Sequence, residues 1–263
     1  MWDAGEYLRF ADERGRPFAD LLAQVTPVAA RRIADLGCGT GSLTRTLAER
    51  WPAARVVGVD RAPEMLARAA PLGVPGRLEF VQADLADWSP GEPVDLLVSN
   101  AALQWVADHD ALLGRLAAML APGGTLAVQM PNRSQTPSHA AVEETAADPR
   151  WAGSLRGVGL HRESVLPIAR YVHRLHELGC RVNAWETTYL HVLRGENPVL
   201  GWLKGTALRP LLGRLVPADA DAFLGALGRR LQAAYPARGD VTLFPMPRLF
   251  FVACKGVDPT RPS

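Results

Sequence analysis

The sequence is poor in the residues that mark several classes of protein. Cysteine occurs three times in 263 residues, without the Cys-x-x-Cys clusters of structural zinc or iron–sulfur sites. We therefore expect no bound metal and reduced, small apolar side chains at Cys38, Cys180 and Cys254. No apolar run approaches the ~20 residues of a membrane span, and no basic run reaches five residues. These absences argue against a membrane partner and a nucleic-acid partner.

Lysine is also nearly absent. Lys204 and Lys255 are the only two, and all other basic residues are arginine, although the net charge is only +2. Genomic base composition explains such an excess as a whole. Individual arginines are nevertheless candidate ligands for carboxylates, because a guanidinium group can bind a carboxylate through two hydrogen bonds and an ammonium group cannot.

The N-terminus lacks the basic and apolar segments of a secretory leader, so we expect a cytoplasmic protein. A chain of this length, 48% of it hydrophobic, can form one large domain. We expect a single domain over residues 1–263, present as a monomer or weak dimer.

Strand and helix signals alternate over the first 130 residues. Such alternation is typical of a parallel sheet with right-handed crossovers, in which ligands bind beyond the carboxyl ends of the strands. Ser42 is expected to cap the first helix, and Pro63 suits the first turn of the second. The predicted strands are Arg32–Leu36, Arg55–Val59, Leu78–Gln82, Val94–Ser99 and Thr125–Met130, and the helices between them are Ser42–Trp51, Pro63–Ala70 and Asp110–Leu120, the last ended by Pro122-Gly123-Gly124.

The pattern changes after Met130. Residues 131–181 predict a helical insertion, with a long helix over Glu163–Leu178, that would form a cap over the ligand crevice. Residues 1–30 predict a helical segment over the same site. The last two predicted strands are Arg181–Leu193 and Arg248–Cys254, and the helical region between them, Asn197–Tyr235, is broken at Pro210 and Pro217.

A glycine-rich loop, Asp35–Gly41, follows the first predicted strand. Its three glycines let the backbone turn tightly and come close to a ligand. The third glycine of a dinucleotide-binding loop would stand at Ser42, and the Gly-Lys pair of a P-loop is absent. Asp35 would repel a pyrophosphate but attract a cation. A ligand with an ammonium or sulfonium group, such as S-adenosylmethionine, therefore fits better than NAD.

Polar residues end the other predicted strands at the same edge of the sheet. Asp60 ends the second strand and can accept hydrogen bonds from ribose hydroxyls. Asp84 follows the third strand and can accept from an adenine amine, and Asn100 ends the fourth. A lone acid after a strand is more often a helix cap. The four elements in this order nevertheless indicate a nucleoside-type cofactor.

This set of motifs resembles the class I S-adenosylmethionine-dependent methyltransferases. The resemblance implies an α/β, Rossmann-like fold whose seven-stranded, mostly parallel sheet has the order 3-2-1-4-5-7-6. It also implies that the glycine loop contacts the methionine part of the cofactor, that Asp60 holds the ribose and that Ala83 and Asp84 flank the adenine. The implied cofactor-binding residues are Asp35, Gly37, Cys38, Gly39, Gly41, Asp60, Arg61, Ala83, Asp84, Leu85 and Asn100, and the product is S-adenosylhomocysteine.

The segment after the fourth strand separates substrate classes. Asn100 is followed by Ala-Ala-Leu, not by the Pro-Pro-aromatic motif of nucleic-acid and protein-amide N-methylases, which leaves small molecules. Several stretches are similar to the trans-aconitate methyltransferases, which methylate one carboxylate of a tricarboxylic acid to a monomethyl ester. They are Tyr7–Ala11 with Arg14, Arg16 and Pro17, Ser99–Trp105, Leu126–Pro131, Thr136–His139, Trp185–His191 and Arg248–Phe250, whereas residues 148–167 match least clearly.

The chemistry agrees with a carboxylate acceptor. A carboxyl group with a pKa near ~4 is ionised at neutral pH, so no general base is needed. We expect no catalytic side chain, and in-line displacement at the sulfonium methyl driven by positioning and desolvation. The remaining carboxylates of the substrate would need arginine or other hydrogen-bonding partners.

The candidate substrate-binding residues each have an ordinary structural alternative. An arginine can form a surface ion pair, Tyr189 and His191 can be sheet packing, and Trp105 can be part of the core. His109 is expected to start a helix, and a metal site at His173 and His176 lacks a third ligand. The candidates are Tyr7, Arg14, Arg16, Trp105, Tyr189, His191, Arg209 and Arg248.

Three other functions stay open at this point. The chain could methylate another small-molecule carboxylate or a hydroxyl, as in a natural-product pathway. It could also bind S-adenosylmethionine without catalysis. An NAD oxidoreductase is the third, and the position of Asp35 argues against it.

Overall fold

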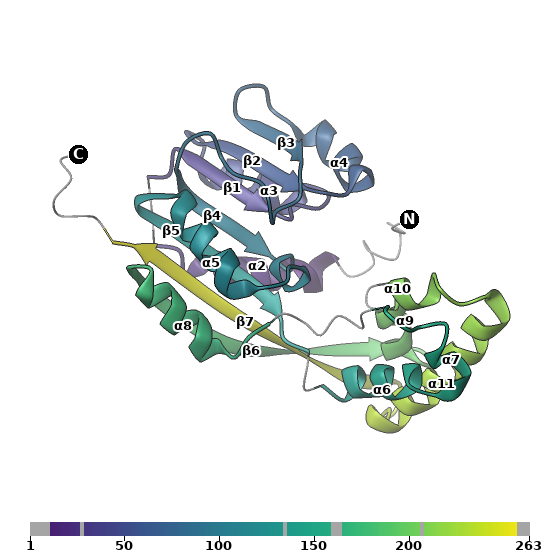
Figure 1. Ribbon diagram of the computed structural model, residues 1–263. Coiled ribbons are helices and arrows are strands. Elements are labelled where there is room, and N and C mark those ends of the chain that lie inside the picture. The colour runs from purple at the N-terminus through teal and green to yellow at the C-terminus, as the bar shows by residue number, and fades with distance from the viewer. Residues whose placement is uncertain (1–10, 27–28, 134–135, 159–164, 206–207, 257–263) are drawn as a thin grey trace.

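The computed structural model describes residues 11–26, 29–133, 136–158, 165–205 and 208–256 (Figure 1). Its seven strands form one sheet in the order β3-β2-β1-β4-β5-β7-β6. Strands β1 to β5 are parallel where they pair, and β7 is antiparallel to both of its neighbours, which confirms the predicted topology. The strands are β1 Arg32–Leu36, β2 Arg55–Asp60, β3 Leu78–Gln82, β4 Val94–Asn100, β5 Leu120–Pro131, β6 Cys180–Arg194 and β7 Val241–Lys255.

Helices cover both faces of the sheet and divide the core into two clusters. On one face, α2 (Ala11–Ala23) and α3 (Ser42–Arg50) bury Phe18 and Leu47. On the other, α5 (His109–Met119) and α8 (Ile168–Glu177) bury Leu116 and Leu175. α4 (Pro63–Ala69) packs beside β2 and β3 and continues into a short 3₁₀ turn, η1 (Ala70–Leu72). None of the helices in the described residues is long and apolar enough to cross a membrane.

Two of the predicted boundaries are wrong. Ser42 does not cap α3: the cap position is Gly41, whose φ of 76° only glycine adopts readily, and Ser42 is the first helical residue. The turn at Pro122-Gly123-Gly124 is not separate from the fifth strand. β5 already begins at Leu120, which pairs with Val94 before the register shifts at a bulge.

Strand β7 begins at Val241, seven residues before its predicted start. The sequence does not reveal this first half of the strand, because it contains two prolines, which are unusual in strands. Pro245 and Pro247 pair with β6 in register. The carbonyl oxygen of Pro247 accepts a hydrogen bond from the Asn132 amide on the β5 side, so the ring nitrogens of the two prolines face away from β6. β5 has ended at Pro131, so a missing N–H there costs no ladder hydrogen bond.

The extended ends of β6 and β7 carry a group of five helices, which we call the helical lobe (Figure 1). Its inner contacts are aromatic: Trp151 meets Phe223 edge-on at 5.3 Å between ring centroids, and Tyr235 meets Phe244 of β7 in the same way. The tyrosine hydroxyl also accepts the Ser138 amide, at 3.0 Å. The lobe consists of α6 (Pro137–Ala146), α7 (Pro149–Ala152), α9 (Pro198–Lys204), α10 (Arg209–Leu212) and α11 (Pro217–Ala234).

The predicted insertion at 131–181 therefore divides between two places. Its first part, α6 and α7, joins the lobe. Its last part, α8, lies on the opposite face of the sheet, because Tyr171 and Leu175 complete the apolar cluster around α5. The predicted helical region after β6 supplies the remaining lobe helices.

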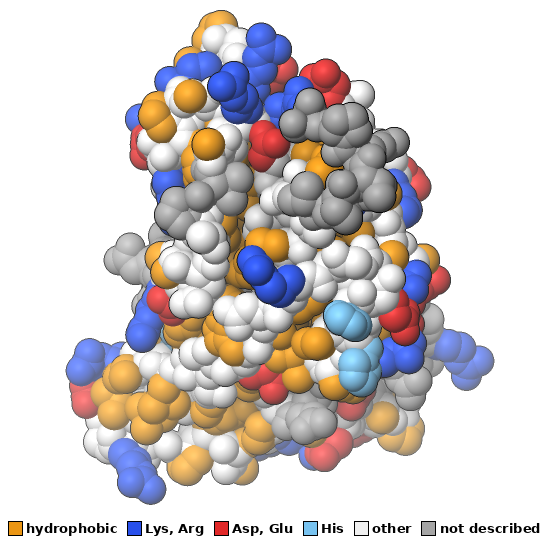
Figure 2. Space-filling view, turned by 90° about the vertical axis from the view of Figure 1, so that its left-hand side faces the viewer, with side chains coloured by type: hydrophobic (Ala, Val, Ile, Leu, Met, Phe, Trp, Pro, Cys, Tyr) orange, Lys and Arg blue, Asp and Glu red, His pale blue; other side chains and the backbone are white. Residues whose placement is uncertain are grey.

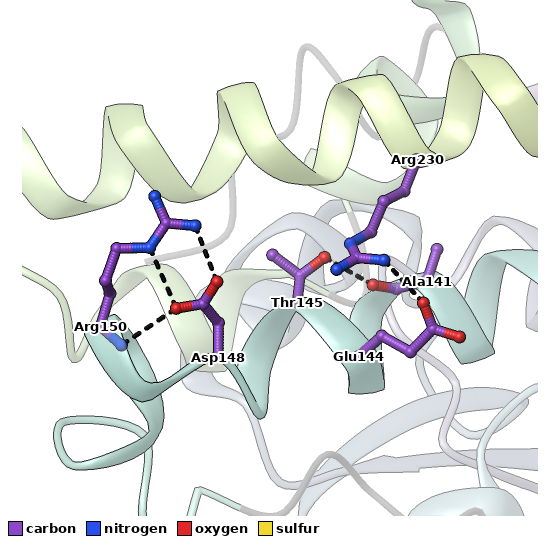
Figure 3. Close-up of polar contacts among 6 residues, drawn as sticks. All are labelled: Ala141, Glu144, Thr145, Asp148, Arg150 and Arg230. Carbon is purple, nitrogen blue, oxygen red and sulfur yellow. Dashed lines mark hydrogen bonds and ion pairs between the residues drawn. The ribbon is translucent and has the colours of Figure 1, made fainter.

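Polar contacts on the outside of the lobe include one that joins α6 to α11 and one within the start of α7 (Figure 3). Arg230 of α11 contacts Glu144 of α6 at 2.7 Å, and Arg150 binds Asp148 at the start of α7. The Arg150 guanidinium holds the pKa of Asp148 at about 2. Because these pairs are exposed, the buried rings and not the charges hold the lobe together.

Candidate functional site

The glycine loop turns at the carboxyl end of β1 and is fastened to β2. The amides of Gly37 and Cys38 both donate to the Val59 carbonyl, at 2.8 and 3.0 Å. The Gly39 amide donates to Asp60 Oδ2 at 2.8 Å. One backbone carbonyl and one carboxylate of β2 therefore shape the loop.

The three glycines of the loop all have positive φ, and they are required for two different reasons. A Cβ on Gly37 would stand 2.1 Å from the Cβ of Ala102, and one on Gly41 would stand 2.6 Å from the Phe80 ring. A Cβ on Gly39 would meet nothing within 4 Å. Gly37 and Gly41 therefore allow close packing, and Gly39 leaves open space in which a ligand can reach the backbone.

Asp35 lies beneath the loop, only 3% exposed. Its Oδ2 accepts a hydrogen bond of 2.7 Å from the Thr44 hydroxyl in the first turn of α3. Burial raises the pKa of Asp35 to about 6, against the lowering effect of that hydrogen bond, and the nearby Asp60 raises it further. A buried carboxylate in this state is stabilised by an incoming cation.

Asp60 and Asp84 lie at neighbouring strand ends. Asp60 Oδ1 accepts from the Ala62 amide and Asp84 Oδ1 from the Ala86 amide, both at 2.9 Å, so each carboxylate also shapes its own turn. Arg61 approaches Asp84 at 4.0 Å across an exposed gap. Ala83 and Leu85, on either side of Asp84, are half-buried.

Asn100 ends β4 beside the loop. The Ser99 hydroxyl donates to the Leu36 carbonyl at 2.8 Å, which ties this end of β4 to β1. Ala101 has a φ of 55°, unusual for a residue with a Cβ, and its amide donates to the Gln129 carbonyl. A strained residue at this position is a common feature of ligand sites.

Two further polar residues at this edge were not predicted as site residues. Gln104 and Gln129 are both buried, and each has a side-chain atom with no hydrogen-bond partner among the described residues. The sequence signal for Gln129 was available, since it interrupts the otherwise apolar run Leu126–Met130. Gln104 lies in the short helix η2 (Leu103–Trp105), which is too short for a pattern of apolar residues to show that its side chain is buried.

Arg248 and Tyr189 lie on one face of the β6–β7 ribbon, the face that α2 covers. Arg248 is buried. The Tyr189 hydroxyl donates to Asp20 Oδ2 at 2.6 Å, and Arg16 lies 5.3 Å from the Tyr189 ring centroid. Burial and the hydrogen bond to Asp20 raise the pKa of Tyr189. The structure thus brings Arg16, Tyr189 and Arg248 to one region through α2, β6 and β7.

The remaining substrate candidates are dispersed. His191 is buried against Trp202 of α9, with ring centroids 4.7 Å apart, so it lies in the packing between ribbon and lobe. Trp105 is 38% exposed and does not belong to the core. Arg209 is half-buried at the start of α10. Tyr7 and the side chain of Arg14 lie outside the described residues.

His109 is the first residue of α5, as predicted, and it is buried. Its Nδ1 is paired with the Tyr171 hydroxyl at 2.5 Å and its Nε2 with the Leu103 carbonyl at 2.9 Å. Burial lowers the pKa of His109, which keeps the ring neutral. Since the carbonyl oxygen can only accept, the neutral ring donates a hydrogen bond from Nε2 and accepts one from the Tyr171 hydroxyl at Nδ1. His109 therefore ties η2 to α8.

The described residues offer no metal site. No group of three or more His, Cys, Asp or Glu side chains in them could hold a metal ion, and all three cysteines are free. Burial raises the pKa of the Cys38 thiol, with Asp35 and Asp60 adding to the effect, so this cysteine is an unreactive thiol at neutral pH. On the face shown in Figure 2, basic side chains are dispersed, several of them beside acidic ones.

A methyltransferase domain model matches residues 33–124, the stretch that contains the glycine loop, β1 to β4 and α5. Solved structures show the same fold over most of the chain. A methyltransferase-like protein of Bacillus halodurans aligns with 90% of this chain and 98% of its own, with a TM-score of 0.60 at 14% identity. A Haloferax volcanii protein solved with the Trm112 methyltransferase activator aligns with 97% and 95%, with a TM-score of 0.56 at 20% identity.

Relatives of known sequence match almost the whole chain. A Streptomyces avermitilis protein named trans-aconitate 2-methyltransferase is 51% identical over 97% of both chains. Proteins of the same name from Streptomyces coelicolor and Mycobacterium tuberculosis are 48% and 46% identical, covering 97% and 96% of this chain and 86% and 96% of their own.

Proposed function

Because the chain belongs to the trans-aconitate 2-methyltransferase family, we propose that it transfers a methyl group from S-adenosylmethionine to one carboxylate of trans-aconitate. The products are a monomethyl ester and S-adenosylhomocysteine. The observation that carries the proposal is the 51% identity to a trans-aconitate 2-methyltransferase over 97% of both chains. Such a match spans the acceptor half of the chain as well as the cofactor motifs.

On the cofactor side, the open space at Gly39 and the acids around the loop fit S-adenosylmethionine. Asp35 beneath the loop favours the cationic methionine part, and Asp60 stands where ribose hydroxyls would be accepted. Ala83, Asp84 and Leu85 would border the adenine. The same loop does not suit NAD, since a buried acid at its base opposes a pyrophosphate.

On the acceptor side, Arg248 is the residue best placed to hold a carboxylate. It is buried, always charged and able to form two parallel hydrogen bonds. Arg16 and Tyr189 lie in the same region, although Asp20 already occupies the tyrosine hydroxyl. Arg209, half-buried at the start of α10, is a further candidate ligand for the acid.

The reaction needs no general base. The acceptor carboxylate is already ionised at neutral pH, so the methyl carbon passes from sulfur to oxygen without moving a proton. The task of the protein is to hold donor and acceptor in line and to exclude water. The helical lobe would complete the enclosure as a cap beside the carboxyl edge of the sheet.

Incubation with S-adenosylmethionine and a panel of acids tests this function. Mass spectrometry should detect a product about 14 Da heavier than trans-aconitate, since one hydrogen is replaced by a methyl group, and related acids such as cis-aconitate and citrate complete the panel. A product from a different acid or from a hydroxyl compound would reassign the substrate. If calorimetry shows binding of S-adenosylhomocysteine but no acceptor gives a product, the chain is a non-catalytic S-adenosylmethionine-binding protein. If NADH binds more tightly than S-adenosylhomocysteine, the chain is neither this methyltransferase nor such a binding protein.

A further inference from the structure

Three carboxamides lie at the carboxyl edge of β4 and β5, two in the turn after β4 and one on β5. Asn100 and Gln129 are register partners, and Gln104 Nε2 donates to the Ala101 carbonyl at 2.7 Å. Each has one buried atom without a hydrogen-bond partner among the described residues: Asn100 Oδ1, Gln104 Oε1 and Gln129 Nε2. An unpaired buried polar atom costs about 1–3 kcal/mol. Three of them at neighbouring strand ends indicate a ligand that pairs with them.

Two of the three unpaired atoms are hydrogen-bond acceptors and one is a donor, and they lie at different places along the edge of the sheet. The two unpaired oxygens belong to the β4 turn, which packs on the glycine loop through Ala102 and Gly37. The orientation of Gln104 is fixed, because its nitrogen is already used by the Ala101 carbonyl. The unpaired nitrogen, Gln129 Nε2, lies one strand further away. The edge thus presents acceptors beside the glycine loop and a donor on β5.

The donor side continues onto β7. Gln129 pairs with Phe250, and Phe250 stacks on Trp185 of β6 at 4.9 Å with nearly parallel rings. Arg248 is two residues from Phe250 and therefore projects from the same face of the sheet. Its Cα pairs with that of Pro131, two residues beyond Gln129. Gln129 and Arg248 are diagonal neighbours, a spacing that long side chains bridge.

The acceptors and the donor at this edge match the charges of the two reactants: acceptors suit a sulfonium cation, and a donor suits a carboxylate. A carbon–sulfur bond of a sulfonium cation breaks and a carbon–oxygen bond to a carboxylate forms, so the positive and negative charges cancel. We propose that Gln129, together with Arg248, binds the acceptor carboxylate, and that the Gln104 carbonyl faces the sulfonium side of the cofactor. This assignment of Gln129 and Gln104 rests on the proposed function and deepens it.

The first test is Gln129→Met, which removes the donor and keeps the volume. The KM for trans-aconitate should rise at least tenfold, since a hydrogen bond to a charged group contributes about 1.5–3 kcal/mol. The Kd of S-adenosylhomocysteine should stay within about twofold, and thermal unfolding should report whether the variant is folded. Gln232→Glu, on the exposed surface of α11, is the matched charge control for the next variant and should change neither quantity.

Gln129→Glu gives a sharper result, because it replaces the donor with a negative charge. The introduced carboxylate would lie diagonally beside Arg248, whose guanidinium keeps it ionised, so it would both repel the substrate and compete for the arginine. KM should rise more than in Gln129→Met at pH 8, and lowering the pH to 5.5 should not restore it. Among the described residues, Arg16 and Asp20 are the charged groups that lie near Tyr189 and Arg248, and they are the same in wild type and in Gln232→Glu.

Gln104→Met tests the cofactor side without any acceptor. Loss of a carbonyl that faces a sulfonium should weaken S-adenosylmethionine about tenfold and the uncharged thioether of S-adenosylhomocysteine much less. Equal changes for both ligands would overturn the assignment of Gln104. An unchanged KM in Gln129→Met, or a KM in Gln129→Glu no higher than that in Gln129→Met, would overturn that of Gln129. Absence of product from wild type with every acid would instead overturn the proposed function, and the two binding constants would still decide Gln104.

Discussion

The two sides of the candidate site are built in different ways. The centre of the cofactor side is one short segment fastened to the next strand: the loop Asp35–Gly41 is shaped by Val59 and Asp60 of β2. The acceptor side collects Gln129, Arg248 and Trp185 from three strands, far apart in the chain, which only the register of β5, β7 and β6 brings together.

This difference explains why the two sides can vary independently. A change in the lobe or in β6 alters the surroundings of the acceptor without touching a single hydrogen bond of the glycine loop. The loop, by contrast, tolerates little, because its shape depends on backbone contacts and positive φ angles. Variants on the two sides should therefore fail in different measurements.

The largest effect is expected for Gly37→Ala. The new Cβ would lie 2.1 Å from that of Ala102 at a φ of 79°, so the loop and the Asn100 turn would have to separate. We expect a loss of about 2–5 kcal/mol in the free energy of unfolding, from strain and overpacking together, and loss of S-adenosylhomocysteine binding. Urea unfolding and calorimetry measure the two effects.

Gly39→Ala is the matched control for that change. It has a φ of 55° but no atom within 4 Å of the new Cβ, so only backbone strain of about 1–2 kcal/mol applies. Binding of S-adenosylhomocysteine should still weaken, because the methyl group enters the open space. Equal destabilisation of the two variants would contradict the separate roles assigned to the glycines.

Arg248→Met should break the acceptor side alone. Removing a buried guanidinium that binds a carboxylate should raise the KM for trans-aconitate about 100-fold, and Arg248→Lys should recover only part of this, since an ammonium cannot bind through two parallel hydrogen bonds. The Kd of S-adenosylhomocysteine should not change. Arg194→Met, which breaks an exposed pair with Asp240 on the same ribbon, is the control. A weakened cofactor in Arg248→Met would show that the two sides are not independent.

Sequence reasoning reached the cofactor side because its information is local. The glycine spacing and the acids at the strand ends are visible in short segments, and the alternation of strands and helices predicts a parallel sheet, whose order came from the resemblance to the class I methyltransferases. It did not show that Asp35 is buried beneath the loop, since burial of one carboxylate depends on how α3 packs.

The acceptor side was only partly accessible for the same physical reason. Arg248 and Tyr189 were predicted as candidates and lie on one face, but the neighbourhood of Gln129 and Arg248 depends on an antiparallel register that no spacing reveals. The first half of β7 was missed because prolines usually exclude a strand, and here their nitrogens face a side without a partner strand. His191 was predicted to bind substrate because it belongs to the family-like stretch Trp185–His191. In the structure it packs against Trp202 of the helical lobe.

Asp35→Asn separates stability from binding on the cofactor side. The pKa of Asp35 is raised from 3.8 to about 6, so its contribution to stability is present below pH 3.8 and lost as pH rises through about 6. The neutral amide keeps that contribution and can still accept from Thr44. The unliganded variant should be about 1–3 kcal/mol more stable than wild type at pH 8, with the difference vanishing near pH 4.

Binding should change in the opposite direction in the same variant. Without the negative charge, S-adenosylmethionine should bind at least tenfold more weakly at pH 8, since a pairing of ionised groups is lost. Thermal unfolding across pH 4–8 and calorimetry give the two numbers. A variant that is less stable than wild type at pH 8 would mean that the Asp35 carboxylate is stabilised by its surroundings even without a cofactor.

The smallest effect is expected where the helical lobe carries its charges. Glu144→Gln removes the ion pair with Arg230, whose side chains are 61% and 45% exposed, so the loss should be below about 1 kcal/mol and smaller still at high salt. Glu177→Gln breaks a comparable pair with Arg174 on α8 and should cost as little. Unchanged KM values in both would mean that the buried aromatic contacts position the lobe. A rise in the KM for trans-aconitate in Glu144→Gln alone would instead show that the α6–α11 ion pair helps to position the acceptor side. If the Kd of S-adenosylhomocysteine were unchanged in that variant, the two sides would still be independent.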